Sequence, residues 1–93
     1  MSEQEPSFPT KMASLGFQPN SPGLGMVCNV SGVKIVAVES PLGIHLHFTR
    51  FTPRTMTQFE VQAPSSCSAP ELAGLIVKNL ESAFPDIAGA KKA

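Results

Sequence analysis

Two histidines in the middle of the chain have the type and spacing that could bind a metal ion. His45 and His47 flank Leu46 in a segment where apolar and polar residues alternate. Residues two apart in an extended strand lie on the same side, with Cα atoms about 6.5–7 Å apart, which suits two ligands of one metal. A thiolate from Cys28 or Cys67 could supply a third ligand. Because neither cysteine belongs to a C-x-x-C pair, we expect no metal and no cofactor, with His45, His47 and Cys28 as the alternative.

Basic and aromatic residues accompany these histidines. Arg50, Phe51 and Arg54 lie on the same predicted strand and its turn, and Lys34 lies on the preceding strand. Aromatic and basic side chains on one sheet face hold single-stranded nucleic acid by base stacking and phosphate contacts. However, seven Lys and Arg residues balance seven Asp and Glu residues, and the chain has no Tyr or Trp. We therefore do not expect a nucleic-acid partner, and a ligand-, metal- or single-stranded nucleic-acid-binding module that uses this face is the alternative function.

The sequence offers little for nucleophilic catalysis. No serine lies in a G-x-S-x-G motif, and no glycine-rich loop could hold a phosphate. Cys67 lies just before a predicted helix, whose dipole would lower the pKa of its thiol. Few acids and bases remain to complete a site around it, so we predict that the protein is not an enzyme.

Four short segments have the residue pattern of consecutive β-strands. Alternating apolar and polar residues, rich in β-branched and aromatic side chains, are typical of half-buried strands. Ser31-Gly32 is a two-residue hairpin signal, and Ser40-Pro41-Leu42-Gly43 has proline and glycine at favoured β-turn positions. Short turns between consecutive strands predict an antiparallel meander. The predicted strands are 26–30, 33–39, 44–51 and 56–63.

A helix is predicted after these strands. Ser68 and Glu71 have the spacing of a capping box, in which each side chain accepts a hydrogen bond from the other's backbone N–H. Apolar residues follow at helical spacing until Pro85, which ends the pattern. We predict an α+β fold, with a three- to four-stranded antiparallel β-meander and one C-terminal α-helix packed on one face.

Composition divides the chain into three parts. Residues 1–25 contain four prolines and three glycines and predict a partly flexible arm without a long helix or a paired strand. Residues 26–85 form the single α+β domain, and residues 86–93 form a flexible tail. Ser21-Pro22 in the arm fits a minimal proline-directed phosphorylation site, and whether Ser21 is modified stays open.

One helix can cover only one face of a sheet, and the second face is also partly apolar. An uncovered patch of this kind usually marks an interaction site. The arm could cover it with Leu15 and Phe17, a second copy could pack on the face or extend the sheet edge, or a different subunit could do so. We expect a protein partner, in a homo-oligomer or a larger complex. The predicted interface residues are Val36, Val38, His45, His47 and Phe51.

The overall composition agrees with an interaction module. Charged residues make up 15% of the 93 residues, where about 25% is usual, and the net charge is zero. The first residues lack the basic and apolar regions of a signal peptide, and no apolar run is long enough to cross a bilayer, so we expect no membrane association. We predict a cytoplasmic or otherwise intracellular, small, non-enzymatic interaction or assembly subunit that self-associates through its second sheet face or sheet edge.

Overall fold

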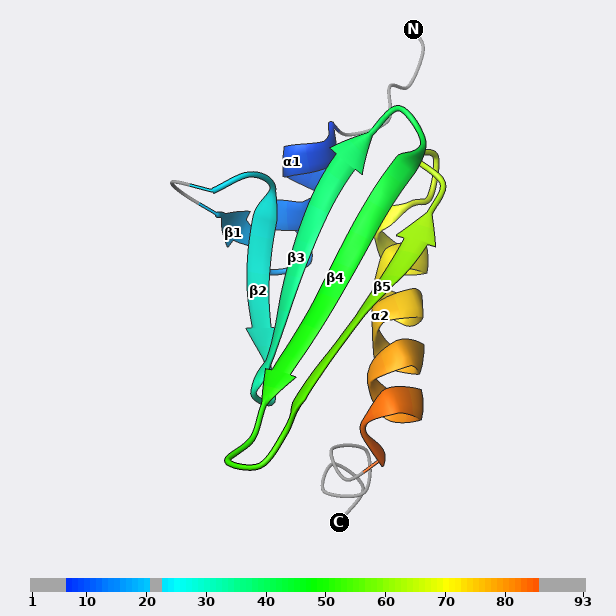
Figure 1. Cartoon of the computed structure of the whole chain (residues 1–93). Helices are drawn as coiled ribbons and strands as arrows, with labels where there is room; N and C mark the ends of the chain where they lie inside the picture. Colours follow the sequence, from blue (N-terminus) through cyan, green and yellow to red (C-terminus); the bar gives the residue numbers. More distant parts are fainter. Residues whose placement is uncertain (1–6, 21–22, 86–93) are drawn as a thin grey trace, which may run out of the picture.

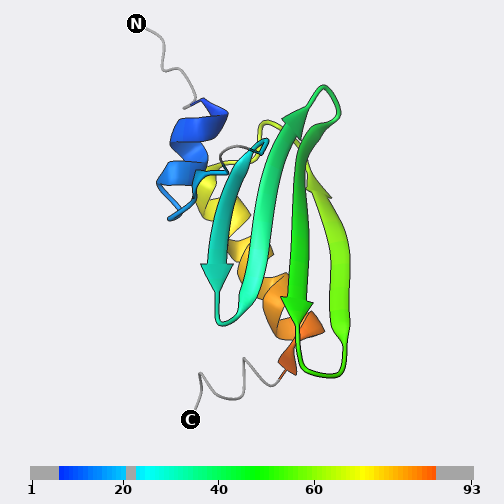
Figure 2. The ribbon, with the colours of Figure 1, turned by 60° about the vertical axis from the view of Figure 1, so that its left-hand side comes forward.

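Five antiparallel strands form one sheet, and two helices lie against the same face of it (Figures 1 and 2). The computed structural model describes residues 7–20 and 23–85. The strands are neighbours in chain order, from β1 at one edge to β5 at the other. The α+β class and the antiparallel sheet are therefore confirmed. The elements are α1 (Phe8–Ala13), β1 (Gln18–Pro19), β2 (Met26–Val30), β3 (Val33–Ser40), β4 (Gly43–Phe51), β5 (Met56–Ala63) and α2 (Ala69–Ala83).

Tight turns connect the central strands. Ser31 and Gly32 have φ angles of 51° and 83° and join Val30 to its partner Val33, as a type I′ hairpin turn requires. Two residues likewise connect β3 to β4, where Ser40 pairs with Gly43. These short connections fix the register, and therefore decide which side chains share a face.

The face covered by the helices, here called the α-face, contains the hydrophobic core. Ile35, Phe48 and Phe59 are aligned across three strands, and the rings of Phe48 and Phe59 stack with centroids 4.8 Å apart. Helix α2 contributes buried apolar side chains at helical spacing. The core residues of the strands are Met26, Val33, Ile35, Ala37, Ile44, Leu46, Phe48 and Ala63, and those of α2 and its end are Leu72, Ile76, Leu80 and Phe84.

The prediction of three to four strands and one helix was wrong because α1 and β1 were missed. Ser7 begins α1 by accepting a hydrogen bond from the Thr10 amide. Pro9 lies in the first turn of α1, where a backbone N–H has no partner within the helix, so proline loses no hydrogen bond there. Six residues are too few to show a helical repeat, and Pro19 conceals the two-residue strand β1. The arm nevertheless contributes to the core, since Met12 is fully buried and Phe17 is 4% exposed.

A buried lysine connects α1 to the loop that precedes α2. Lys11 is only 4% exposed, and its Nζ donates hydrogen bonds to the carbonyl oxygens of Ser65 at 3.1 Å and Cys67 at 2.7 Å. Its ammonium group therefore has partners despite its burial.

The predicted capping box begins α2. The Ser68 amide donates to Glu71 Oε1 at 2.8 Å, and the Glu71 amide donates to Ser68 Oγ at 3.3 Å. The helix ends at Ala83, two residues before Pro85.

Neither helix described here has the length and apolar character needed to cross a membrane. The predictions for Ser21 and for residues 86–93 lie outside the described residues.

Candidate functional site

The face opposite the helices, here called the open face, brings four of the five predicted interface residues together. Val36 pairs with His47 and Val38 pairs with His45 across β3 and β4, and all four side chains are half-buried. Phe51 lies on the same face but at the far end of β4, about 13 Å from His47 at the usual strand rise. There it is 70% exposed. The predicted interface is therefore a compact cluster with one separate aromatic residue.

A chain of hydrogen bonds runs across the open face. Ser40 Oγ lies 2.7 Å from His45 Nε2, and His45 Nδ1 lies 2.6 Å from Glu60 Oε2. His47 Nδ1 is 4.0 Å from the other carboxylate oxygen of Glu60. Glu60 was not among the predicted site residues, because its place beside both histidines depends on the pairing of β4 with β5.

The hydroxyl of Ser40, the imidazole of His45 and the carboxylate of Glu60 are hydrogen-bonded in the same order as the three groups of a serine-hydrolase triad. Here, however, Ser40 Oγ also accepts a hydrogen bond from the Leu42 amide at 3.1 Å, which stabilises the turn between β3 and β4. On the other side of the turn, Gln62 Nε2 donates to the Leu42 carbonyl oxygen at 3.2 Å. These bonds give Ser40 and His45 a structural role in holding the ends of β3, β4 and β5 together.

The structure separates the residues of the alternative metal site. Cys28 pairs with Ile35 and lies on the α-face, whereas His45 and His47 lie on the open face. In the part of the chain that the structure describes, no three His, Cys, Asp or Glu side chains are grouped as metal ligands would be.

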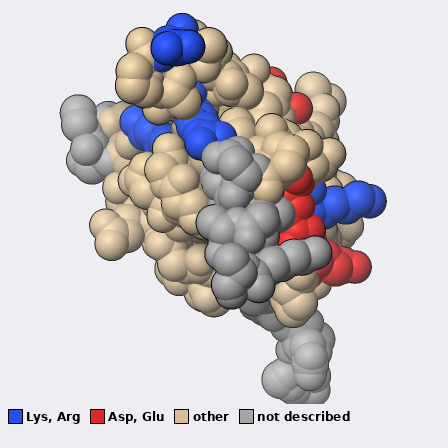
Figure 3. Space-filling view, turned by 90° about the horizontal axis from the view of Figure 1, so that it is seen from below, with Lys and Arg blue, Asp and Glu red and all other residues tan. Residues whose placement is uncertain are grey.

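The basic residues of the nucleic-acid alternative are also divided between the two faces. Lys34 is exposed on the open face, and Arg54 is exposed in the turn between β4 and β5. Arg50, by contrast, extends along the α-face, with its guanidinium 5.1 Å from the centre of the Phe84 ring. Figure 3 shows the molecule from below: blue Lys and Arg side chains lie in its upper part, and red Asp and Glu side chains lie mainly to the right of its centre, beside one further blue side chain.

The pKa of the Cys67 thiol is raised above its ordinary value, whereas the sequence indicated a lowered one. Burial raises the pKa of the Cys67 thiol, and the negative charge of Glu71 raises it further, while Lys11 lowers it by a smaller amount. Burial also raises the pKa of Cys28. Both thiols therefore remain protonated at neutral pH and are poor nucleophiles.

The two edges of the sheet differ in how well they are covered. β1 pairs with Met26 and Val27 of β2 and contains Pro19, which cannot donate a backbone hydrogen bond. At the other edge, β5 is eight residues long, and none of the described elements pairs with its outer side.

Comparisons with protein-family models, curated proteins and solved structures give no match for this chain.

Proposed function

We propose that this protein is a non-enzymatic assembly subunit that self-associates by pairing β5 with β5 of a second copy. The observation that carries the proposal is the long outer edge of β5, which no described element covers. Natural sheets usually protect such an edge with proline, lysine, a bulge or a very short strand. β5 contains neither proline nor lysine, and it pairs residue by residue with β4 along its whole length.

The backbone geometry identifies the groups that would form the new ladder. Ser40 and Gly43 flank a two-residue turn, so they form a hydrogen-bonded pair, and such pairs recur at every second residue. Continued through β4, this alternation directs the backbone of Phe59 and Val61 toward β4. The residues whose N–H and C=O groups point outward are Met56, Gln58, Glu60 and Gln62.

Pairing at the edge is favoured over packing of two open faces. Face-to-face packing would bury Lys34 and Asn29 together with the carboxylate of Glu60, and buried polar groups without partners are costly. Edge pairing instead gives partners to backbone groups and leaves the open face in water. A two-fold axis through the paired strands makes the contact self-complementary, so assembly stops at the dimer.

The experiment is sedimentation equilibrium of the full chain from low to high micromolar concentration, with two proline variants. Gln58→Pro removes an outward N–H from β5. Asn29→Pro is the matched control, because Val30 and Val33 flank a two-residue turn and the Asn29 N–H therefore points outward at the other edge. We expect Gln58→Pro to weaken dimerisation about 5- to 150-fold, since the two-fold symmetric dimer loses one hydrogen bond from each copy and each contributes about 0.5–1.5 kcal/mol.

A second measurement does not depend on the variants. In the wild-type protein, hydrogen exchange at the amides of Gln58, Glu60 and Gln62 should slow as concentration rises, while exchange at Asn29 stays constant. A wild-type protein that remains monomeric throughout, or a Gln58→Pro variant that dimerises as strongly as Asn29→Pro, would overturn the proposal.

A further inference from the structure

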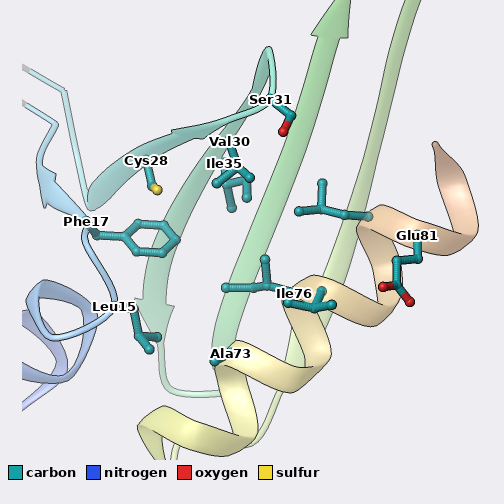
Figure 4. A pocket seen from close by; sticks show the side chains of 11 residues that line it. Leu15, Phe17, Cys28, Val30, Ser31, Ile35, Ala73, Ile76 and Glu81 are labelled. Atoms are coloured by element: carbon teal, nitrogen blue, oxygen red, sulfur yellow. The ribbon is translucent and has the colours of Figure 1, made fainter. Parts of the chain in front are cut away.

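An apolar pocket lies on the α-face between β2, β3 and α2. Cys28 and Ile35 project from the sheet toward the helix, and Ala73 and Ile76 face them from α2 (Figure 4). Phe17, from the arm, closes the pocket at the end nearest α1. The pocket exists because α2 and the arm approach the sheet from two sides, and their side chains do not fill the space between them.

The pocket has the size for one small apolar group. Its volume is about 180 Å³. An engineered apolar cavity of about 150 Å³ stays dry and binds benzene, so this space is sufficient for a ligand of about six carbons. Val77, which is 44% exposed, lies in the wall that opens to solvent. A ligand could therefore enter without unfolding the domain.

The end of the pocket away from Phe17 is polar and favours a cation. Ser31 in the turn between β2 and β3 and Glu81 near the end of α2 line this end. The last turn of α2 contains no basic residue, so the negative end of the helix dipole adds to the charge of Glu81. Neither Lys78, three residues before Glu81 on α2, nor Arg50, whose guanidinium contacts the Phe84 ring, lines the pocket.

We propose that this pocket binds a small molecule with an apolar body of about six carbons and a terminal ammonium group. The apolar body lies against Ile35 and Ile76, and the ammonium lies at the end that carries Ser31 and Glu81. This inference is independent of self-association, because the pocket is on the α-face and β5 does not line it.

Nuclear magnetic resonance of the full chain tests this proposal with n-hexylammonium as the probe. The ¹H–¹⁵N spectrum should show saturable shifts at Cys28, Ile35 and Ile76, with no shifts at His47. Hexanol tests the apolar part alone, and hexanoate reverses the charge. We expect hexylammonium to bind about two- to five-fold more tightly than hexanol, the usual range for an exposed ion pair, and hexanoate to bind most weakly.

Two variants separate the two parts of the site. Glu81→Gln, at an exposed position, should reduce hexylammonium binding to the level of hexanol and leave hexanol unchanged. The matched control Glu60→Gln removes a carboxylate from the open face and should change neither. Ala73→Phe fills the pocket and should weaken both ligands at least about tenfold; its spectrum first shows whether it is folded.

The two cysteines give a second readout. Both thiols are half-buried with a raised pKa, but only Cys28 lines this pocket. Bound hexylammonium should therefore slow alkylation of Cys28 by iodoacetamide and leave Cys67 unaffected, as measured by peptide mass spectrometry. Equal protection of both thiols, non-saturable shifts, or equal binding of the amine and the carboxylate would overturn the proposal.

Discussion

Replacement of Lys11 by methionine should destabilise the fold by about 2 kcal/mol. Methionine keeps most of the aliphatic side chain but removes the ammonium that donates to the Ser65 and Cys67 carbonyl oxygens. A carbonyl group that loses its donor costs about 1–3 kcal/mol. Both carbonyls belong to a loop with partial access to water, so the lower end of that range applies to each, and the two together give the estimate.

Urea unfolding followed by circular dichroism is the appropriate assay, because the chain has no Trp or Tyr for fluorescence. With a urea dependence of about 1–3 kcal/mol per molar, the midpoint should fall by about 1 M. In a thermal experiment, the same loss corresponds to about 8–16 °C for a domain of this size. Because a dimer's stability depends on concentration, variant and wild type must be compared at one concentration.

The matched control is Lys78→Met, the same substitution at an exposed position on α2. A surface change of this kind should alter stability by less than about 0.5 kcal/mol. If Lys11→Met unfolds at the same midpoint as Lys78→Met, the hydrogen bonds of Lys11 do not hold α1 against the loop, and the reasoning fails.

Three further predictions concern the turn between β3 and β4 and helix α2. Gly43 has a φ of 133°, and a Cβ there would collide with the Ala63 carbonyl oxygen, so Gly43→Ala should cost at least about 1 kcal/mol in urea unfolding. Gly74→Ala, in open space within α2, should instead stabilise by about 0.5–1 kcal/mol. The Ser68 backbone hydrogen bond lowers the pKa of Glu71 below its ordinary value of 4.5, so the stability it confers is present above that value and is lost as pH falls further. Glu71→Gln should reduce this acid-dependent loss, and an unchanged pH profile of the unfolding midpoint would contradict it.

The parts of the fold that the sequence predicted are those with a repeated local signal. Alternation over eight residues identified β5, and the capping residues Ser68 and Glu71 identified the start of α2. Alternation in β3 likewise placed Val36 and Val38 on the face opposite the core residues Ile35 and Ala37. In contrast, α1 is six residues long and depends on Met12 and Lys11, whose partners lie far away in the sequence.

The missed features of the site depend on pairing and packing across distant segments. Glu60 joins the histidines only through the register of β4 with β5. The sequence interpretation grouped Arg50 with the histidines because all three lie on the same predicted strand. Strand geometry places Arg50 on the α-face instead, over Phe84. The location of Leu15 and Phe17 could not be inferred either, because both sheet faces offered them apolar contacts. The structure places them at the pocket on the α-face, which leaves the open face without cover from the described arm residues.

The polar cluster on the open face also affects how the β5 edge can pair. Glu60 is the only charged residue of β5, and its carboxylate is already within 2.6 Å of His45 Nδ1. When His45 Nδ1 carries the proton, it donates a hydrogen bond to this carboxylate. In the proposed dimer, a register that pairs Glu60 with Glu60 of the second copy would place two like charges opposite each other, which is unfavourable. In that register, the hydrogen bond from His45 on each copy would reduce the repulsion, so His45 would contribute to the proposed self-association through Glu60 while remaining one strand away from the edge.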